Sequence, residues 1–344
     1  MLIMKIEEIL GKLVSFNTVN DSEKEKMFDF IRVFLTDYHF RFKNVGACLV
    51  AERGKSKIGF LGHTDTVPAS EKWTTNPWEL VQKGDKLYGL GVCDMKSGIA
   101  AMLFVASQTE KAVTFYFTYD EEIGFAGIRD LIAEEEFPET VIICEPTDER
   151  VLNTGKGLFE FRVDFSGVRV HSSVATDDKN AIFRATDFIN ELRNFSAELR
   201  KSQPNHNFSI PFTSMNVGQI SGGDSVNSTA EKCWIVADFR TNPNEHQKVR
   251  EEIKRLSNEQ PIKLTILNDI EPFENKISER EIDRIFDRNF EGDDGMTEAS
   301  FLPRTTTRII YGAGPDTSHQ ADEYVSLESL KRVAIIYKQL IEQS

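Results

Sequence analysis

Short apolar runs alternate with amphipathic stretches through the first 150 residues. The runs are rich in β-branched and aromatic side chains, which predicts buried strands at 47–51, 58–61, 113–119 and 141–144. Apolar positions with helical spacing predict helices at 4–15, 22–37 and, among small residues, 97–107. Strands that alternate with helices are typical of an α/β sheet covered on both faces.

A different pattern begins near Lys156. Residues 159–165 alternate apolar and polar side chains, as expected for a half-exposed strand. The pattern then predicts a helix at 178–199, strands at 213–220 and 231–239, a helix at 244–257 and a strand at 262–268. The order β-α-β-β-α-β is that of a ferredoxin-like unit.

Mixed α/β character returns after Pro272, with helices predicted near 278–289 and 326–342. The simplest interpretation is an α/β domain formed by residues 1–155 and 269–344, with a second α+β domain, 156–268, inserted into it. A chain of 344 residues is long enough for two such domains.

Charge and cysteine usage narrow the class of protein. The net charge of −14 makes duplex nucleic acid and anionic membranes poor partners. The four cysteines are scattered without a CxxC pair, which favours reduced thiols in a cytosolic enzyme. Glu7 and Glu8 interrupt the N-terminal apolar pattern, so no signal peptide is expected there, and no stretch is apolar enough to span a bilayer. We therefore expect a cytoplasmic protein.

His63 and Asp65 directly follow the apolar run at 58–61. In open α/β sheets, ligands bind at the carboxyl ends of the strands. A histidine is a good zinc ligand, and a carboxylate two residues later can hold its other ring nitrogen. On its own, however, a His-x-Asp pair is weak evidence and is more often a hydrogen-bonded surface pair than a metal site.

Acidic residues follow two further predicted strands. Asp120, Glu121 and Glu122 come directly after the run at 113–119, and Glu145 comes directly after the run at 141–144. Three consecutive carboxylates repel one another unless a cation neutralises them, although acidic loops are often simply exposed.

Two more candidates lie in glycine-rich loops. Asp94 precedes the small-residue helix, where an acid is also a common helix N-cap. His319 follows the segment Gly312-Ala-Gly-Pro, and an isolated histidine in such a loop often has no functional role.

Taken together, the five loops supply two imidazoles and three carboxylates. The set His63, Asp94, Glu122, Glu145 and His319 suits a pair of zinc ions that share one bridging carboxylate. Glu121 is then left beside a ligand, where a general base is needed.

In this order the motifs resemble the acetylornithine deacetylase/succinyl-diaminopimelate desuccinylase family of zinc peptidases and amidohydrolases. The motifs are GHTDTVP, GLGVCDMKSG, TYDEEIG, CEPT, GKGLFEFRVDFSGVRVHSS, GGDSVNSTAEKC, DFR and SHQADEY. They extend from about residue 58 to residue 325. The resemblance implies a zinc-peptidase-like catalytic domain with a mixed sheet, and an inserted ferredoxin-like domain that acts as lid and dimerisation domain.

The resemblance also implies a role for each metal-site residue. His63 and Glu145 would hold one zinc ion, Glu122 and His319 the other, and Asp94 would bridge the two. Asp65 would orient His63, and Glu121 would be the general base. Each subunit would bind two zinc ions, which Co²⁺ or Mn²⁺ could replace.

Three residues of the inserted domain match other family positions. His171 resembles the histidine that crosses from one subunit to the active site of its partner, which implies a homodimer, although the sequence alone also fits a polar residue at a strand end. Asn227 and Arg240 match positions that bind substrate, and Arg240 suits a bidentate grip on an α-carboxylate.

The segment Thr297-Glu298-Ala-Ser-Phe301 resembles that of acetylornithine deacetylases. This favours hydrolysis of N-acetyl-L-ornithine, or of acetylcitrulline or acetyllysine, in amino-acid biosynthesis. Glu298 would then contact a cationic substrate side chain, or it is a solvated loop acid. Succinyl-diaminopimelate desuccinylase and dipeptidase remain alternatives, as does an inactive homologue that only binds or dimerises.

Overall fold

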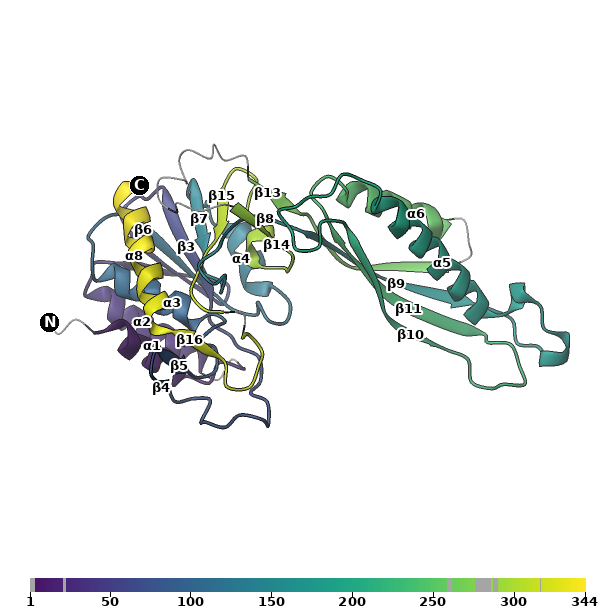
Figure 1. Cartoon of the computed structure of the whole chain (residues 1–344), viewed down its shortest axis with the longest axis horizontal. Helices are drawn as coiled ribbons and strands as arrows, with labels where there is room; N and C mark the ends of the chain where they lie inside the picture. The colour runs from purple at the N-terminus through teal and green to yellow at the C-terminus, as the bar shows by residue number, and fades with distance from the viewer. Residues whose placement is uncertain (1–3, 21–22, 259–261, 276–285, 287–289, 316) are drawn as a thin grey trace. The chain divides into compact units, whose positions relative to one another are not determined.

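A computed structural model describes residues 4–20, 23–258, 262–275, 286, 290–315 and 317–344. The chain forms two compact units (Figure 1). Unit 1 comprises Met1–Asn153, Asn275–Glu291 and Thr297–Ser344, and unit 2 comprises Thr154–Glu274 and Gly292–Met296. Apart from Phe286, the helix predicted at 278–289 lies outside the described residues.

The sheet of unit 1 has the strand order β1-β2-β6-β3-β7-β15-β8. These strands are β1 (Arg41–Val45), β2 (Cys48–Arg53), β3 (Ile58–His63), β6 (Val113–Thr118), β7 (Thr140–Ile143), β8 (Val151–Gly155) and β15 (Thr307–Ile310). The central strands β6, β3, β7 and β15 run parallel, whereas β1, β2 and β8 pair antiparallel. β8 also pairs with β13 (Phe273–Glu274) and β14 (Phe290–Asp293). This mixed sheet confirms the predicted α/β class.

The described part of unit 1 contains the helices α1 (Ile6–Val14), α2 (Lys24–Thr36), α3 (Lys96–Ala106), α4 (Ala126–Glu134) and α8 (Leu327–Gln343). Of these, α1, α2 and α8 pack around α3, whereas α4 packs against β1 and β2. α3 contacts β3 and also α1, α2 and α8, which lie together in Figure 1. Ten of its eleven residues are buried, and their small side chains allow this close packing.

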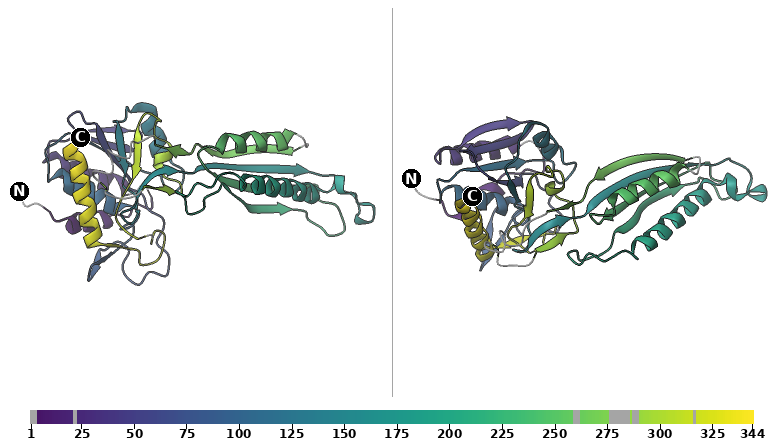
Figure 2. Two further views of the ribbon diagram at one scale, coloured as in Figure 1. Left: turned by 45° about the horizontal axis from the view of Figure 1, so that its top comes forward. Right: turned by 90° about the horizontal axis from the view of Figure 1, so that it is seen from above.

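Unit 2 has the element order β9 (Gly157–Ser166), α5 (Ala181–Leu199), β10 (Ser214–Gly222), β11 (Lys232–Thr241), α6 (His246–Asn258) and β12 (Ile262–Ile270). Its sheet order, β10-β11-β9-β12, is antiparallel throughout and is that of a ferredoxin-like unit. Alternate residues of β9, from Phe159 to Phe165, are buried in one core with α5 and α6. The two helices run alongside the four strands (Figure 2).

A small sheet in unit 1 joins two distant segments. β4 (Val81–Lys83) pairs with β5 (Lys86–Tyr88), and β5 pairs with β16 (Tyr324–Ser326), which follows the His319 loop.

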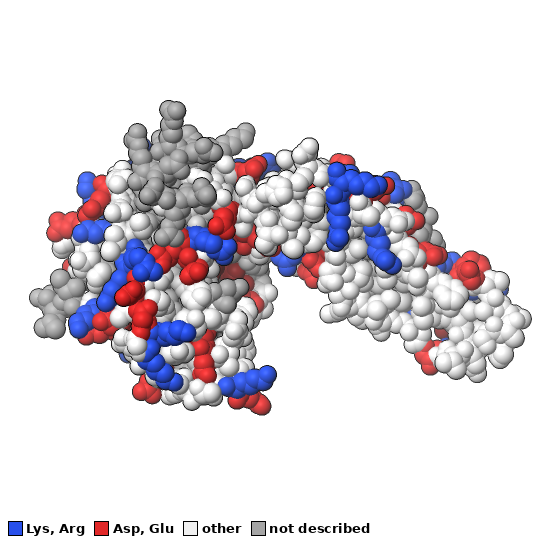
Figure 3. All heavy atoms as spheres, in the orientation of Figure 1, with Lys and Arg blue, Asp and Glu red and all other residues white. Residues whose placement is uncertain are grey.

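Basic and acidic side chains are interspersed over the visible face of unit 1 (Figure 3). The four cysteines are buried and free. Within the described part of the chain, no helix has the length and apolarity needed to cross a bilayer.

Candidate metal centre

The predicted ligands of unit 1 meet at one edge of its sheet. β3 pairs in parallel with both β6 and β7, so these strands end side by side. His63 is the last residue of β3, Glu121 and Glu122 lie just beyond β6, and Glu145 lies just beyond β7. The carboxyl ends of parallel strands form the ligand-binding edge of such a sheet.

Asp94 lies between the two imidazoles. His63 Nε2 is 2.9 Å from Asp94 Oδ1, and His319 Nε2 is 3.6 Å from Asp94 Oδ2. Asp94 precedes α3 and is followed by a cis peptide bond to Met95. Its two oxygens thus face different histidines, as a bridging carboxylate requires.

The remaining two carboxylates divide between the histidines. Glu145 Oε1 is 3.8 Å from His63 Nε2, and Glu122 Oε2 is 3.0 Å from His319 Nε2. Ligand atoms of His63, Asp94 and Glu122 all lie within 4.8 Å of one another. The structure therefore gathers all five residues of the predicted set into one cluster.

Asp65 connects the two halves of this cluster. Its backbone oxygen is 3.1 Å from His63 Nδ1, and its carboxylate Oδ1 is 3.6 Å from the same nitrogen. The other oxygen, Oδ2, accepts a hydrogen bond of 3.2 Å from the backbone N–H of Glu122. Asp65 thus fixes the ring of His63, which is 1% exposed, and holds the loop that carries Glu122.

The charges of the cluster perturb one another. Burial raises the pKa of Glu145, and the neighbouring carboxylate of Asp94 raises it further. Burial likewise raises the pKa of Glu121, and Asp94 adds to this shift although His63 opposes it. Burial alone would lower the pKa of His63, but hydrogen bonds with Asp65 and Asp94 raise it. Such opposed shifts are common at functional sites.

The donor set fits a pair of divalent cations. Imidazole nitrogens and carboxylate oxygens are the ligands that zinc takes in catalytic sites. Glu145 Oε1 is buried and has no hydrogen-bond partner, although burying an unpaired carboxylate oxygen is unfavourable. A cation beside Asp94 and Glu145 would satisfy this oxygen and reduce the repulsion between the acids.

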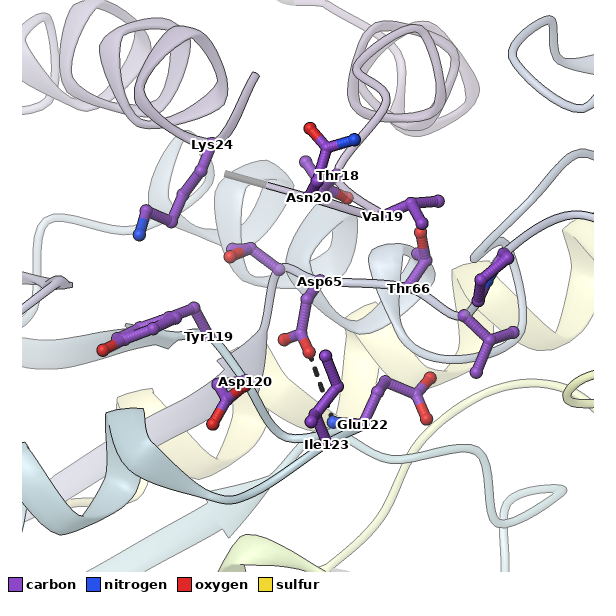
Figure 4. Close-up of a pocket in the computed structure, with 13 residues that line it drawn as sticks. Thr18, Val19, Asn20, Lys24, Asp65, Thr66, Tyr119, Asp120, Glu122 and Ile123 are labelled. Atoms are coloured by element: carbon purple, nitrogen blue, oxygen red, sulfur yellow. Dashed lines mark hydrogen bonds between the residues drawn. The ribbon is translucent and has the colours of Figure 1, made fainter. Parts of the chain in front are cut away.

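A cavity of about 330 Å³ adjoins the cluster (Figure 4). Thr18, Val19 and Asn20 line one side of it, and Tyr119, Asp120, Glu122 and Ile123 line the opposite side. Residues 64–68 and Lys24 complete the lining. Sequence reasoning missed the contribution of residues 18–20 and Lys24, because they belong to no motif that indicates a binding site.

Glu298 is fully buried, so it is not a solvated loop acid. It begins the short 3-10 helix Glu298–Ser300, and its Oε2 accepts a hydrogen bond of 2.9 Å from the hydroxyl of Thr118, the last residue of β6. Its Oε1 has no hydrogen-bond partner. Burial raises the pKa of Glu298 to about 7.

Three predicted residues belong to unit 2. His171 is exposed, its Nδ1 is 2.8 Å from Ser173 Oγ, and it forms an isolated β-bridge with Ser228. Asn227 is also exposed, and its backbone oxygen accepts a hydrogen bond from Ser172 N–H. Arg240 lies on β11, with its Nε 3.4 Å from Asp238 Oδ2. The structure thus places His171 and Asn227 in neighbouring segments of this unit.

Comparison with known proteins identifies the family to which the chain belongs. Residues 59–343 match Peptidase family M20/M25/M40. Acetylornithine deacetylase from Pasteurella multocida (strain Pm70) is 31% identical over 319 residues, which cover 86% of this chain and 83% of that protein. The chain therefore belongs to the M20/M25/M40 peptidase family and is a metal-dependent hydrolase, as the motifs predicted.

Solved structures agree on the fold. Aminopeptidase PepT from Bacillus cereus ATCC 10987 has a TM-score of 0.79 and 18% sequence identity, with 98% of both chains covered. The YXEP protein of Bacillus subtilis, described as a dinuclear metal binding peptidase from the M20 family, has a TM-score of 0.73 and 14% identity, covering 98% of this chain and 96% of that chain.

Proposed function

We propose that the protein hydrolyses the amide bond of a small N-acyl amino acid and that its preferred substrate is N-acetyl-L-ornithine, with acetylcitrulline or acetyllysine as close relatives. The observation that carries this proposal is the cluster of two imidazoles and three carboxylates around Asp94, next to a cavity of about 330 Å³. The choice of the acyl amino acid is supported by the similarity to an acetylornithine deacetylase.

His63 and Glu145 would hold one zinc ion, His319 and Glu122 the other, and Asp94 would bridge them. The contacts of His63 with Asp94 and Glu145, and of His319 with Glu122 and Asp94, support this pairing. When bound, the metal pair would polarise the amide carbonyl and lower the pKa of the attacking water. Co²⁺ and Mn²⁺ accept similar ligands and would be substitutes.

Glu121 would be the general base. It takes a proton from the attacking water while the water oxygen adds to the amide carbon, and it returns the proton to the leaving nitrogen as the C–N bond breaks. The raised pKa of Glu121, caused first by burial, suits a carboxyl group that must hold a proton near neutral pH. Asp65 keeps the ring of His63 in place during these steps.

We further propose that the protein is a homodimer, with unit 2 as its lid and dimerisation domain. The exposure of His171 and Asn227 would allow both to reach a bound substrate, His171 in the active site of the partner subunit. Arg240 would bind the α-carboxylate of the substrate through its guanidinium group. Glu298, being buried beside Thr118, would favour a cationic substrate side chain through its charge.

A substrate panel tests the proposed function. The zinc-loaded protein should have a kcat/KM for N-acetyl-L-ornithine at least about tenfold above that for succinyl-diaminopimelate or an unblocked dipeptide, which corresponds to about 1.4 kcal/mol of transition-state binding. A higher value for either competitor would replace the proposed substrate. Stoichiometric zinc binding without turnover of any amide would identify an inactive homologue.

A further inference from the structure

Cys93 is a buried thiol next to the proposed bridging ligand. The residue is fully buried and immediately precedes Asp94. Its Sγ donates a hydrogen bond of 3.0 Å to the backbone oxygen of Pro315 and lies 3.7 Å from the hydroxyl oxygen of Ser318. Ser318 is followed directly by His319. The thiol therefore links the loop of Asp94 to the segment that carries His319, although 222 positions of sequence separate Cys93 from Pro315.

Gly314 brings the backbone of this segment close to the thiol. Its φ is 104°, a conformation that glycine adopts far more readily than other residues. A Cβ atom at Gly314 would lie 3.2 Å from Cys93 Sγ, which is closer than ordinary van der Waals contact. A buried free cysteine behaves as a small apolar side chain with a weak S–H donor. Cys93 thus holds the segment both by filling the space beside Gly314 and by donating to Pro315.

On its other side, the same segment is bound to the loop that follows β7. The backbone N–H of Asp148 donates a hydrogen bond of 2.9 Å to the oxygen of Gly314, and the N–H of Glu149 donates one of 3.0 Å to the oxygen of Gly312. The segment therefore lies between two loops that carry proposed ligands. The contacts to the loop after β7 are made by backbone atoms, whereas the contact described above is made by the side chain of Cys93. A substitution at Cys93 can thus loosen one side of the segment and leave the other side intact.

The position of His319 depends on how the backbone of this segment is held. Its side chain is 54% exposed, so surrounding side chains constrain it less than they constrain a buried one. The side chain of His63, by contrast, is buried, and this residue ends a central strand of the sheet. A shift of the segment would therefore change the 3.6 Å between His319 Nε2 and Asp94 Oδ2 more than the 2.9 Å between His63 Nε2 and Asp94 Oδ1.

We infer that Cys93 is a positioning residue, which holds the loop of Asp94 against the segment of His319 so that both side chains can bind the same metal ion. This inference rests on the proposed metal roles of Asp94 and His319. Loss of an outer contact that orients metal ligands typically lowers metal affinity by about 10- to 100-fold. Cys93 should therefore affect how tightly the zinc pair is held, while its own thiol donates to Pro315 and is not a ligand.

The test measures the zinc affinity of the full chain by titration against a competing chelator, and the unfolding free energy of the metal-free protein by denaturant. Cys93→Ala removes both the donor and the volume of the sulfur, so it should bind zinc about 10- to 100-fold more weakly than the wild type. Cys93→Ser keeps a donor in a smaller side chain, so its loss of zinc affinity should be smaller.

Cys233→Ala is the matched control. Cys233 is also buried and free, but it lies on β11 of unit 2, whereas all five proposed ligands belong to unit 1. The same atoms are removed in Cys233→Ala and in Cys93→Ala. Whatever its effect on the unfolding free energy, the control should leave zinc affinity unchanged.

Three outcomes would overturn the inference: wild-type zinc affinity in a folded Cys93→Ala protein, a loss in Cys93→Ser as large as in Cys93→Ala, or an equal loss in Cys233→Ala. Should Cys93→Ala not fold, Cys93→Ser replaces it, and this variant must bind zinc more weakly than Cys233→Ser. The proposed function fails separately, when wild-type protein with bound zinc does not hydrolyse N-acyl amino acids.

Discussion

Glu121, Glu122 and Glu145 share a small region with Asp94, and burial raises the pKa of each of the three glutamates. The charge of Asp94 adds to all three shifts, because like charges at short range disfavour ionisation. A divalent cation would favour the ionised form of the ligands among them, whereas a general base beside the cation must still accept a proton. Adjacent glutamates can thus have different roles, and the first of the pair is the proposed base.

Replacement of Glu121 by Gln separates the role of general base from that of metal ligand. The amide has nearly the shape of the carboxyl group but cannot take a proton from water, so kcat should fall by about 10²- to 10⁴-fold. Zinc content should not change, because Glu121 is outside the proposed ligand set. Steady-state kinetics and metal analysis of the same preparation check both expectations.

Glu139→Gln is the matched control. Glu139 is exposed and pairs with Lys57 at 3.2 Å, so the same chemical change there should leave kcat and zinc content unaltered. Near-normal turnover in Glu121→Gln would remove this residue from the mechanism. Loss of zinc from the variant would instead make Glu121 a ligand.

At the level of elements, the site depends on how closely α3 approaches the end of β7. A Cβ atom at Gly98 would lie 2.7 Å from Cys144 Cβ and would overlap the backbone oxygen of Cys144. Asp94 precedes α3, and Glu145 follows Cys144, so this contact sets the separation of two proposed ligands. Only glycine permits such close packing of two backbones.

Gly98→Ala should therefore separate α3 from β7. Overpacking of this kind costs about 1–3 kcal/mol of unfolding free energy. Zinc affinity should fall as well, because Asp94 and Glu145 move apart. Denaturant unfolding of the metal-free protein measures the first effect, and chelator competition measures the second.

Gly11→Ala provides a control that should change the free energy of unfolding in the opposite direction. Gly11 lies in α1, and a Cβ there would meet the side chain of Leu80 at 3.6 Å, an ordinary contact distance. Alanine in a helix interior is more stable than glycine by about 0.5–1 kcal/mol, so this variant should be slightly stabilised with unchanged zinc affinity. A stable Gly98→Ala protein with normal zinc affinity would show that the α3–β7 contact does not determine the site.

The elements that carry the site were the easiest to predict. β3, β6 and β7 are buried along nearly their whole length, so each appears in the sequence as an unbroken apolar run. β1 was missed, because Arg41–Val45 is largely exposed at the sheet edge and has no apolar alternation. β15 was also missed, because Thr307–Ile310 contains a charged residue, Arg308, and only two apolar residues, Ile309 and Ile310. Short or edge strands depend on pairing that sequence patterns do not contain.

At the level of the whole molecule, the ligands are brought together over more than 250 positions of sequence, from His63 to His319. Three of them, His63, Glu122 and Glu145, follow predicted strands, which indicated a common edge of the sheet. The burial of Glu298 was not predictable, because it depends on the packing of its 3-10 helix against Thr118.

Unit 1 is assembled from segments on both sides of unit 2 in the sequence. Glu121 belongs to unit 1 and the exposed His171 to unit 2. If His171 acts on the active site of the partner subunit, the two residues can be supplied by different chains of a homodimer. Symmetry then requires that each subunit both gives and receives one histidine.

Mixed dimers test this arrangement. We expect Glu121→Ala and His171→Ala homodimers each to be nearly inactive. A heterodimer of the two, isolated with a different affinity tag on each chain, should recover about half of the wild-type activity per dimer, because one of its two sites then has both residues. If His171 acts within its own chain, each site of the heterodimer lacks one residue, and activity should stay at the level of the homodimers. Absence of any doubly tagged species after co-expression would contradict the homodimer itself.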